Sequence, residues 1–424
     1  MDPGRKSIDV QQTDPGKTAD DDHGKRLVDA AELLIVRDGM HAVTVDAIAA
    51  AARVSKKAIY ERFANKEEIF AAVLDRVTSR MPSAGIEPDA PLRDALERFA
   101  QTHLRYLNNP PVYHLMRIAI EAMREFPEVS AGYHERRRST ARDQIGYIAA
   151  GIDAGRIRGD CGDALNLATR IGSVAMGGAR PLFLGDERMK SIAKRSAFAA
   201  DLLAYGYRGI EGQSPPFREQ QIDSAGEAMP QTSRLRPEKK EKLLTTAARI
   251  FCRDGMRQAN IDEIIAASGV ARSTIYRNFE NKEGLFYSAI QHRIATMDDP
   301  VGMDASGPMD SAVEATTIAL LKNHARPESL SLQRILIEEQ RTVPDLAKAF
   351  YQQRLNYTGR ALSAIFAQAD LPAPSLDLVE GYYILATFSV RFIASEDRPS
   401  SAMLEEAARH GAHIFLGGIA GPHA

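Results

Sequence analysis

Apolar residues recur at three- and four-residue spacing along nearly the whole chain of 424 residues. Side chains at that spacing share one face of an α-helix. The alternating pattern with hairpin turns that is typical of β-strands is not seen in the sequence. The pattern therefore predicts an all-α protein.

One stretch of this helical pattern occurs twice. VSKKAIYERFANKEEIF begins at Val54, and VARSTIYRNFENKEGLF begins at Val270, 216 positions later. Residues 37–70 align with residues 253–286 without a gap and share 16 of 34 positions. A weaker match relates RIAIEAMREFPEV from Arg117 to RILIEEQRTVPDL from Arg334. A period this long indicates a duplicated domain pair that covers most of each half, because solenoid repeats are far shorter.

Each copy is predicted to begin with a helix that ends at a glycine. These helices span about 25–38 and 238–254, and they end at Gly39 and Gly255, where a left-handed glycine commonly stops a helix. Polar caps then mark two further helix starts in each copy: Thr44 and Asn260 before a short second helix, and Asn65 and Asn281 before a fourth.

A tight turn and a third helix lie between those caps. The third helix is expected at Ser55–Phe63 in the first copy and at Ala271–Phe279 in the second. Glu68 follows Asn65 at the spacing of a capping box, which the second copy lacks.

About 130 residues of long amphipathic helices follow in each copy, and the C-terminal helix pairs, Ala164–Ile210 and Leu376–Ile419, are apolar with small residues on one face. The stretch between the copies has the composition of a linker. The expected organisation is a disordered leader (1–23), head 1 (24–78), body 1 (79–210), a linker (211–236), head 2 (237–293) and body 2 (294–424).

Charge is distributed unevenly over this organisation. The net charge of the chain is −2. Residues 24–80 contain ten Lys and Arg and eight Asp and Glu, a net charge of +2. Residues 233–293 contain twelve Lys and Arg and seven Asp and Glu, a net charge of +5, so the rest of the chain has a net charge of −9. The two repeated segments are therefore the basic parts of an acidic protein, where a polyanion is expected to bind.

Two short helices joined by a tight turn, the second polar and basic, are typical of a helix-turn-helix. In the third helix of each copy the apolar residues four apart face inward. The residues left to face a DNA groove are of types that contact bases and phosphates: Lys56, Lys57, Tyr60 and Arg62 in head 1, and Arg272, Ser273, Tyr276, Arg277 and Asn278 in head 2.

Lys66 and Lys282 each occupy the first position after an asparagine cap. The positive end of the helix dipole disfavours a cation there. The same lysine in both copies indicates a compensating anion, and a DNA phosphate at the helix start would supply one.

The sequence at this point resembles the DNA-binding domain of the TetR (tetracycline-repressor) family. The resemblance covers some 45 residues of each copy and implies two three-helix DNA-binding heads, each on a helical regulatory and dimerisation body. It implies phosphate contacts by Thr44, Tyr60 and Lys66 in head 1 and by Asn260, Tyr276 and Lys282 in head 2. It implies base-facing roles for Lys56, Lys57, Arg272, Ser273 and Thr274.

Two positions depart from the family pattern. Arg53 stands where the turn usually has a glycine, which head 2 keeps as Gly269, and Ala271 stands where the recognition helix usually begins with a serine, which head 1 keeps as Ser55. Neither change removes a phosphate-binding position, so both heads are expected to bind DNA.

The resemblance also predicts the partners. The main one is a double-stranded DNA operator, read as an imperfect palindrome because the two recognition helices differ. A small apolar effector is expected in at least one body, with no membrane association and no cofactor. A single chain is expected to act as a pseudo-dimer through its C-terminal helix pairs, with a homodimer of chains as the alternative.

Other classes of function find less support. The sequence contains no HExxH metal motif, phosphate-cradling glycine loop or nucleophile elbow, so an enzyme is not expected. Cys161 and Cys252 are too few for a disulfide scaffold and fit a reducing cytoplasm. The alternatives that stay open are a helical interaction or architectural protein whose heads are not ligand-regulated, and an activator in place of a repressor.

Overall fold

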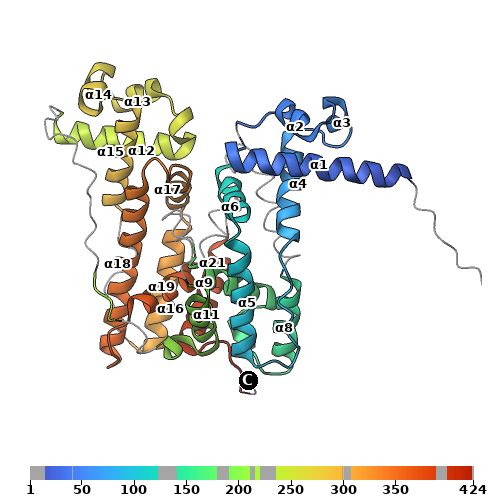
Figure 1. The fold of residues 1–424 in the computed structure, drawn as a ribbon. Helices are drawn as coiled ribbons and strands as arrows, with labels where there is room; N and C mark the ends of the chain where they lie inside the picture. The colour runs from blue at the N-terminus through green and yellow to red at the C-terminus, as the bar shows by residue number, and fades with distance from the viewer. Residues whose placement is uncertain are drawn as a thin grey trace, which may run out of the picture. The chain divides into compact units, whose positions relative to one another are not determined.

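The computed structural model describes residues 15–40, 42–122, 141–178, 191–210, 215–219, 235–297, 299, 307–387 and 399–422. Within these residues the regular structure is helical (Figure 1), apart from two isolated β-bridges that pair Ile157 with Ala420 and Pro216 with Ser375. The prediction of an all-α fold is confirmed. The chain forms two compact units, residues 1–80 and residues 81–424.

The first unit contains head 1. Helix α1 packs against α2 and α4, and α2 against α3, around side chains that are almost fully buried: Ile35, Ile48, Ile59 and Phe70. The helices are α1 (Pro15–Asp38), α2 (Val45–Ala52), α3 (Lys56–Tyr60) and α4 (Lys66–Ser79). Helix α1 begins inside the expected leader, and α3 ends three residues before the expected Phe63.

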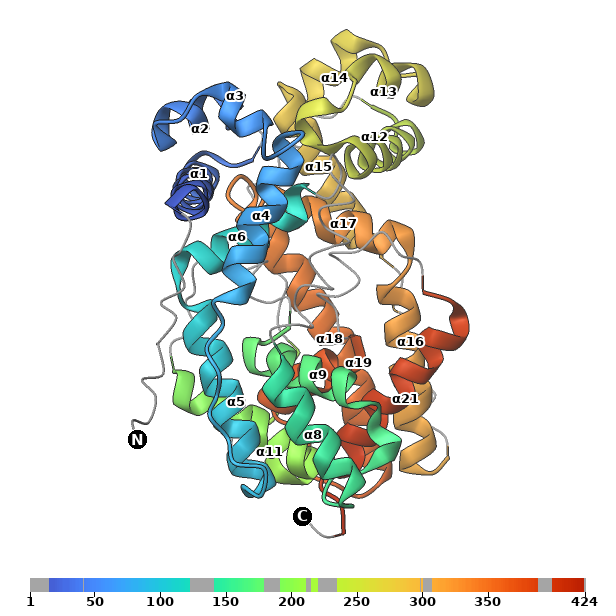
Figure 2. The same cartoon turned by 90° about the vertical axis from the view of Figure 1, so that its right-hand side faces the viewer.

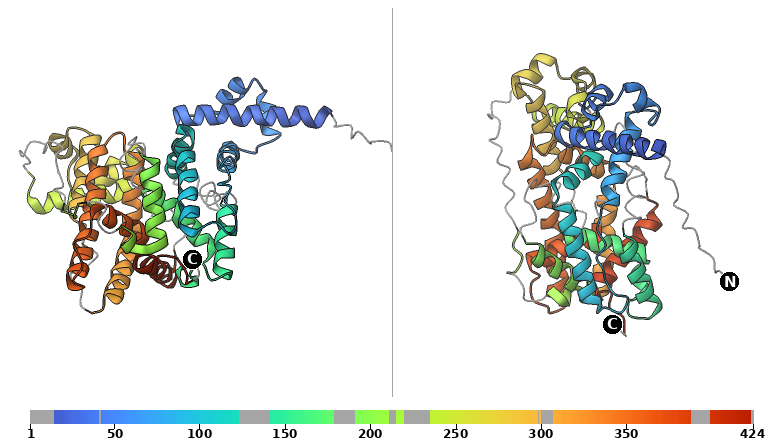
Figure 3. Two further views of the ribbon diagram at one scale, coloured as in Figure 1. Left: turned by 60° about the horizontal axis from the view of Figure 1, so that its bottom comes forward. Right: turned by 45° about the vertical axis from the view of Figure 1, so that its right-hand side comes forward.

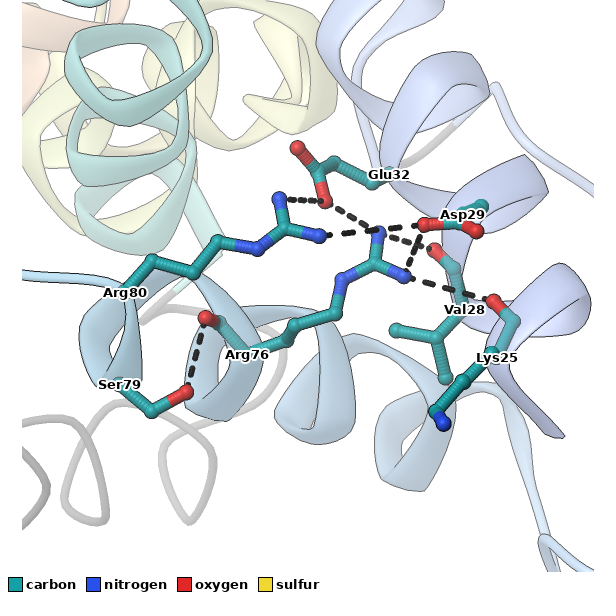
Figure 4. Close-up of polar contacts among 7 residues, drawn as sticks. All are labelled: Lys25, Val28, Asp29, Glu32, Arg76, Ser79 and Arg80. Carbon is teal, nitrogen blue, oxygen red and sulfur yellow. Dashed lines mark hydrogen bonds and ion pairs between the residues drawn. The ribbon is translucent and has the colours of Figure 1, made fainter. Parts of the chain in front are cut away.

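A cluster of charged side chains joins α4 to α1 in head 1 (Figure 4). The guanidinium of Arg76 forms ion pairs with Asp29 and Glu32 and donates to the carbonyl oxygen of Val28 at 3.1 Å. Arg80 lies 3.5 Å from the Glu32 carboxylate. Because Arg76 satisfies carboxylates and a backbone carbonyl together, it fixes the angle between the two long helices of the head.

Head 2 has the same four helices, with bounds α12 (Pro237–Gln258), α13 (Ile261–Ser268), α14 (Arg272–Phe279) and α15 (Lys282–Ala295). Its core uses the equivalent positions, and Phe251 and Phe286 meet edge to face at 5.1 Å. At the positions of Asp29 and Arg76, head 2 has Thr245 and His292, whose polar atoms lie 3.4 Å apart. At these two positions head 2 therefore has a Thr–His contact in place of the Asp–Arg ion pair of head 1.

The glycine helix stops are present in both heads. Gly39 follows α1 with φ +80° and Gly255 has φ +79°. After Gly255 the backbone makes one further helical turn to Gln258, so α12 is kinked at the glycine and continues past the expected end.

Body 1 begins with α5, which packs extensively against α11 and also against α9. Tyr147 of α8 meets Phe99 of α5 edge to face at 5.7 Å and donates to the carbonyl of Ala90 at 2.7 Å. The elements are α5 (Leu92–Leu107), α6 (Pro110–Ala122), α8 (Arg142–Asp153), η1 (Gly159–Cys161), α9 (Ala164–Met176), α11 (Ile192–Tyr205) and η2 (Gly206–Ile210).

Body 2 repeats this arrangement, with α16 packed against α18, α19 and α21 (Figure 2). The buried hydroxyl of Tyr382 bonds to Thr317 at 3.0 Å and joins α19 to α16. Head 2 contacts this body at two places, where α12 packs against α17 and where α15 packs against α18. The helices are α16 (Met309–His324), α17 (Pro327–Glu338), α18 (Pro344–Gln368), α19 (Leu376–Thr387) and α21 (Ser401–Gly417).

The C-terminal helix pairs of the two bodies pack together within the chain. Helix α9 contacts α19 and α11 contacts α21, and both views of Figure 3 keep the green α11 beside the red helices of the second repeat. The ring of Tyr207 packs against the rings of Phe366 and Phe415, at centroid distances of 5.5 and 5.8 Å. The buried Arg170 of α9 donates to the carbonyls of Leu385 and Ala407 at 2.8 and 2.7 Å.

The last described residues of the second repeat extend this interface with backbone hydrogen bonds. Ile419 donates to the carbonyl of Leu203 at 2.7 Å, and its own carbonyl accepts from Arg158 at 2.9 Å. Gly421 donates to the carbonyl of Arg156 at 2.7 Å. The chain end thus inserts between two segments of body 1.

Part of the expected linker also has a defined place. Phe217 donates from its backbone to the carbonyl of Pro374 at 2.7 Å, and Glu219 forms an ion pair with Arg360. Residues 215–219 are therefore held against body 2, and most of the expected linker lies outside the described residues.

Candidate DNA-binding surface

The second helix of each head begins at the predicted cap. The Thr44 hydroxyl oxygen accepts from the backbone N–H of Ala47 at 3.1 Å, and the Asn260 side-chain oxygen accepts from Asp262 at 2.8 Å. Both side chains are exposed. Capping uses only the acceptor oxygens of these side chains. The Thr44 hydroxyl hydrogen and the Asn260 amide N–H groups can therefore still donate hydrogen bonds to a phosphate.

The turns into the recognition helices differ in the two heads. Arg53 ends α2 with φ +56°, a left-handed conformation that costs a non-glycine residue about 1–2 kcal/mol, whereas Gly269 adopts φ +72° without that cost. Ser55 then caps α3 by accepting from Ala58 at 3.1 Å, and Ala271 gives α14 no side-chain cap. Each head therefore keeps one of the two favourable local features.

The recognition helices present the predicted residues to solvent. Ile59 and Ile275 are fully buried, which confirms the inward face. None of the predicted DNA-contacting side chains is buried: Thr44, Lys56, Lys57, Tyr60, Asn260, Arg272 and Ser273 are exposed, and Lys66, Thr274, Tyr276 and Lys282 are partly exposed. The exposed ring of Tyr60 is free of the core packing that a tyrosine at this position could have had.

An aspartate on the preceding helix pairs with the first cation of each recognition helix. The Lys56 ammonium lies 3.0 Å from the Asp46 carboxylate, and Arg272 forms the equivalent ion pair with Asp262. Hydrogen bonding to the aspartates raises the pKa of Lys56 and of Arg272, so both stay charged. Exposed pairs of this kind add little stability, so their main effect is to hold the two cations against the preceding helix.

Sequence reasoning did not assign a role to Asp46 and Asp262. The signal was present, because the two aspartates are identical between the copies and stand ten positions before a cation in both. Only the crossing of the second and third helices shows that this separation brings the two side chains together.

The contacts of Lys282 correct one step of the sequence argument. Its ammonium donates to the carbonyl oxygen of Arg257 at 2.8 Å, near the end of α12. The negative partner that compensates Lys282 at its helix start therefore lies inside head 2, and an external anion is not needed to explain it. An ammonium has three donors, so the phosphate contact stays a prediction.

Arg62 is the second correction. A Cβ atom built on Gly24 of α1 would lie 2.6 Å from the Arg62 Cζ atom, so the guanidinium rests on α1 and not on the groove-facing surface. In head 2 the equivalent Asn278 donates to the carbonyl of Thr274 at 2.6 Å, while Arg277 is exposed.

The turns after the recognition helices also differ. In head 1 Asn65 caps α4 by accepting from Glu68 at 2.8 Å, and the Glu68 carboxylate accepts from Ala64 at 2.8 Å, one residue before the position that a capping box would use. In head 2 Glu280 adopts φ +60° and Gly284 takes the place of Glu68. Head 2 therefore continues α14 to Phe279, whereas α3 of head 1 ends at Tyr60.

Comparison with known families identifies these heads. The family model for bacterial regulatory proteins of the tetR family matches the chain twice, at residues 27–73 in head 1 and at residues 243–289 in head 2. The model of the C-terminal domain of AefR-like transcriptional repressors matches residues 94–164. The two heads therefore belong to the tetR family, one head in each of two tandem units. The resemblance seen in the sequence is thereby confirmed.

Individual relatives match parts of this tetR-family chain. It is 35% identical to the HTH-type transcriptional regulator YerO of Bacillus subtilis over 57 residues, which are 13% of this chain and 20% of YerO. It is 24% identical to the HTH-type transcriptional regulator SrpR of Pseudomonas putida over 147 residues, 33% of this chain and 67% of SrpR. The match to YerO thus spans about a fifth of that relative's length.

A solved structure of a TetR-family transcriptional regulator from Mesorhizobium loti is also similar, with 16% identity and a TM-score of 0.36 over 43% of this chain and 94% of that one.

Among the helices of the described ranges, none is long and apolar enough to cross a membrane.

Proposed function

We propose that this tetR-family chain is a ligand-responsive repressor that acts in the cytoplasm and reads a pseudo-palindromic operator with two unlike half-sites. The observation that carries the proposal is the pair of recognition helices. In both, the first cation forms an ion pair with an aspartate of the preceding helix. The exposed residues nevertheless differ, with Lys56 and Lys57 in head 1 and Arg272 and Ser273 in head 2.

The half-site difference has a direct chemical reason. An arginine can donate two parallel hydrogen bonds to a guanine, whereas a lysine ammonium is a point donor and a serine hydroxyl is short and non-selective. Head 1 and head 2 therefore favour different bases at equivalent positions of their half-sites.

Selection of bound sequences from random DNA with the whole protein is expected to yield an imperfect palindrome. Lys56→Ala or Lys57→Ala should alter base preference in one half-site only, and Arg272→Ala in the other. Each loss should cost about 1–3 kcal/mol, or roughly 5- to 150-fold in affinity. Lys322→Ala, which removes an exposed lysine paired with Glu405 on body 2, is the charge-matched control and should leave both half-sites unchanged. A perfectly symmetric consensus would contradict the proposal.

A single chain is proposed to fill one operator as a pseudo-dimer. The support is the intrachain bundle of α9, α11, α19 and α21, together with the backbone hydrogen bonds of residues 419–421 to body 1. These contacts occupy the helix faces that a second chain would otherwise need.

Light scattering at micromolar concentration is therefore expected to give the mass of one chain, and titration of a full operator should saturate at one chain per site. Salt should weaken binding in both heads because phosphate contacts release counterions. A stable dimer of chains in free solution would contradict the pseudo-dimer while leaving the DNA-binding proposal intact.

At least one body is proposed to bind a small, mainly apolar effector that weakens DNA binding. Helix α17 of body 2 packs directly against α12 of head 2, so a shift of α17 would move the head. By linkage, an effector that lowers DNA affinity tenfold must bind the DNA-bound chain tenfold less tightly, a coupling of about 1.4 kcal/mol.

A further inference from the structure

Body 2 encloses a group of polar side chains that its helices bring together at one level. Asn323 and His324 end α16, Ser329 and Gln333 lie on α17, and Arg354 lies on α18. Their exposed fractions are 7%, 1%, 8%, 0% and 2%. Five polar residues this deeply buried need a reason, because each loses its hydration when the body folds.

Arg354 is the charged member of this group. One Nη atom donates to the Asn323 side-chain oxygen and the other to the Ser329 hydroxyl, both at 2.7 Å, and the Phe350 ring lies 5.1 Å from Cζ. The Nε–H has no hydrogen-bond acceptor, and no carboxylate of the described residues pairs with the guanidinium. Burial lowers the pKa of Arg354, because the groups around the guanidinium compensate its positive charge poorly.

His324 and Gln333 add further unsatisfied atoms beside the guanidinium. Both ring nitrogens of His324 and the side-chain oxygen of Gln333 are buried without a hydrogen-bond partner in the described structure. Burial and the charge of Arg354 hold the pKa of His324 well below its usual range, so the ring is neutral at pH 7 and offers one donor and one acceptor. Buried polar atoms in native proteins are normally satisfied, so this concentration indicates a missing partner.

Aromatic rings border the same group. The His324 ring lies 6.3 Å from that of Tyr383, which in turn lies 6.1 Å from that of Tyr351. An unsatisfied cation and imidazole beside aromatic rings match a ligand with a charged end and an apolar part.

Body 1 has apolar residues at three of the positions that are polar in body 2. Helices α5 and α16 correspond at an offset of 217, as do α6 and α17. At the positions of His324, Ser329 and Gln333, body 1 has the apolar residues Leu107, Val112 and Met116, and Leu107 and Val112 are buried. At these three positions, two of them buried in body 1, the first copy has apolar side chains where the second copy has polar ones.

We propose that body 2 binds a small organic carboxylate, whose oxygens accept from the Nε and Nη edge of Arg354 and from His324, with its apolar part against Phe350, Tyr351 and Tyr383. This inference deepens the proposed effector-responsive function and rests on it. The carboxylate would supply the acceptors that the Nε–H lacks, in the bidentate geometry that a guanidinium favours. Because α17 also contacts α12, the occupied site would act on head 2.

Matched acids and amides test the charge requirement in the full chain. Benzoate and octanoate are compared with benzamide and octanamide in thermal-shift and calorimetric titrations. At least one carboxylate should raise the unfolding temperature and release heat, and its amide should bind at least tenfold more weakly. If every amide performs as well as its acid, or if neither acid binds, the proposal is overturned.

Variants locate the binding at Arg354. Arg354→Met should abolish carboxylate binding, and His324→Leu, Ser329→Val and Gln333→Met, which place body 1 residues in body 2, should each weaken it while keeping the arginine. Arg93→Met in body 1 removes an arginine that already pairs with Asp201 and Glu97, and should leave binding unchanged. Carboxylate binding that survives both Arg354→Met and His324→Leu, with far-ultraviolet circular dichroism unchanged, would refute the site.

DNA binding separates this inference from the function on which it rests. Octanoate at saturation should lower the affinity of the wild-type chain for its selected operator about tenfold and leave the Arg354→Met variant unaffected. If the chain binds its operator and no carboxylate binds, only the ligand inference fails. If carboxylates bind at Arg354 and the chain selects no DNA sequence, the proposed function fails and the site stands.

Discussion

Replacing Gly284 by alanine is expected to lower the affinity of the chain for its full operator by about a hundredfold or more. A Cβ atom at this position would lie 2.1 Å from the carbonyl oxygen of Phe279, because the left-handed Glu280 folds the end of α14 back onto the start of α15. Backbone must move to admit the methyl group, and the recognition helix α14 moves with it. With head 2 displaced, the chain binds through head 1 alone and loses the gain from two linked contacts. Fluorescence anisotropy with an operator duplex measures the loss.

Glu68→Ala in head 1 is the matched control, since Glu68 occupies the equivalent position. That change removes the carboxylate that accepts from Ala64, which should cost head 1 about 1 kcal/mol of stability and the operator affinity less than tenfold. If Gly284→Ala and Glu68→Ala have equal effects on DNA binding, the two turns are equivalent and the argument from the close approach at Gly284 is wrong.

Replacing Arg170 by alanine is expected to reduce the free energy of unfolding by about 2–5 kcal/mol. Arg170 of the first repeat is buried and donates to two carbonyls of the second, Leu385 and Ala407. Both contacts are hydrogen bonds from a charged donor, which contribute more than bonds between neutral groups. Truncation removes the buried donor that joins the two repeats and opens a space between them. Urea unfolding monitored by circular dichroism gives the change.

Arg195→Ala provides the comparison within one repeat. Arg195 of α11 donates to the Ala175 carbonyl at the end of α9 at 3.0 Å, but it is partly exposed and both helices belong to body 1. Its loss should cost about 1 kcal/mol and leave the contact between the bodies intact. A larger cost for Arg195→Ala than for Arg170→Ala would mean that the interface between the bodies contributes little to the stability of the chain.

The sequence by itself determined the elements of the heads and their duplication. Helix caps such as Thr44, Asn65, Asn260 and Asn281 act within three residues of their own position, so local sequence suffices to place them. The inward face of the recognition helices followed from the periodicity of Ile59 and Ile275, and the gapless repeat identified the tandem organisation. These features depend on neighbours in the chain, which the sequence displays directly.

Only the tertiary structure decided where the longer side chains go. Arg62 rests on α1 and Lys282 bonds to the end of α12, although the spacing of both residues is compatible with a groove-facing role. A flexible side chain reaches several positions, and the helix packed nearby selects among them.

The environment of Arg354, whose Nε–H has no acceptor, could likewise not be predicted from the sequence. Its lack of a carboxylate partner among the described residues, and its position beside His324, follow from the crossing of α16, α17 and α18. Residues 324 and 354 are thirty positions apart, and the sequence pattern assigned no role to either. Burial removes the water that would have satisfied them, and burial is a property of the packed body and not of either helix alone.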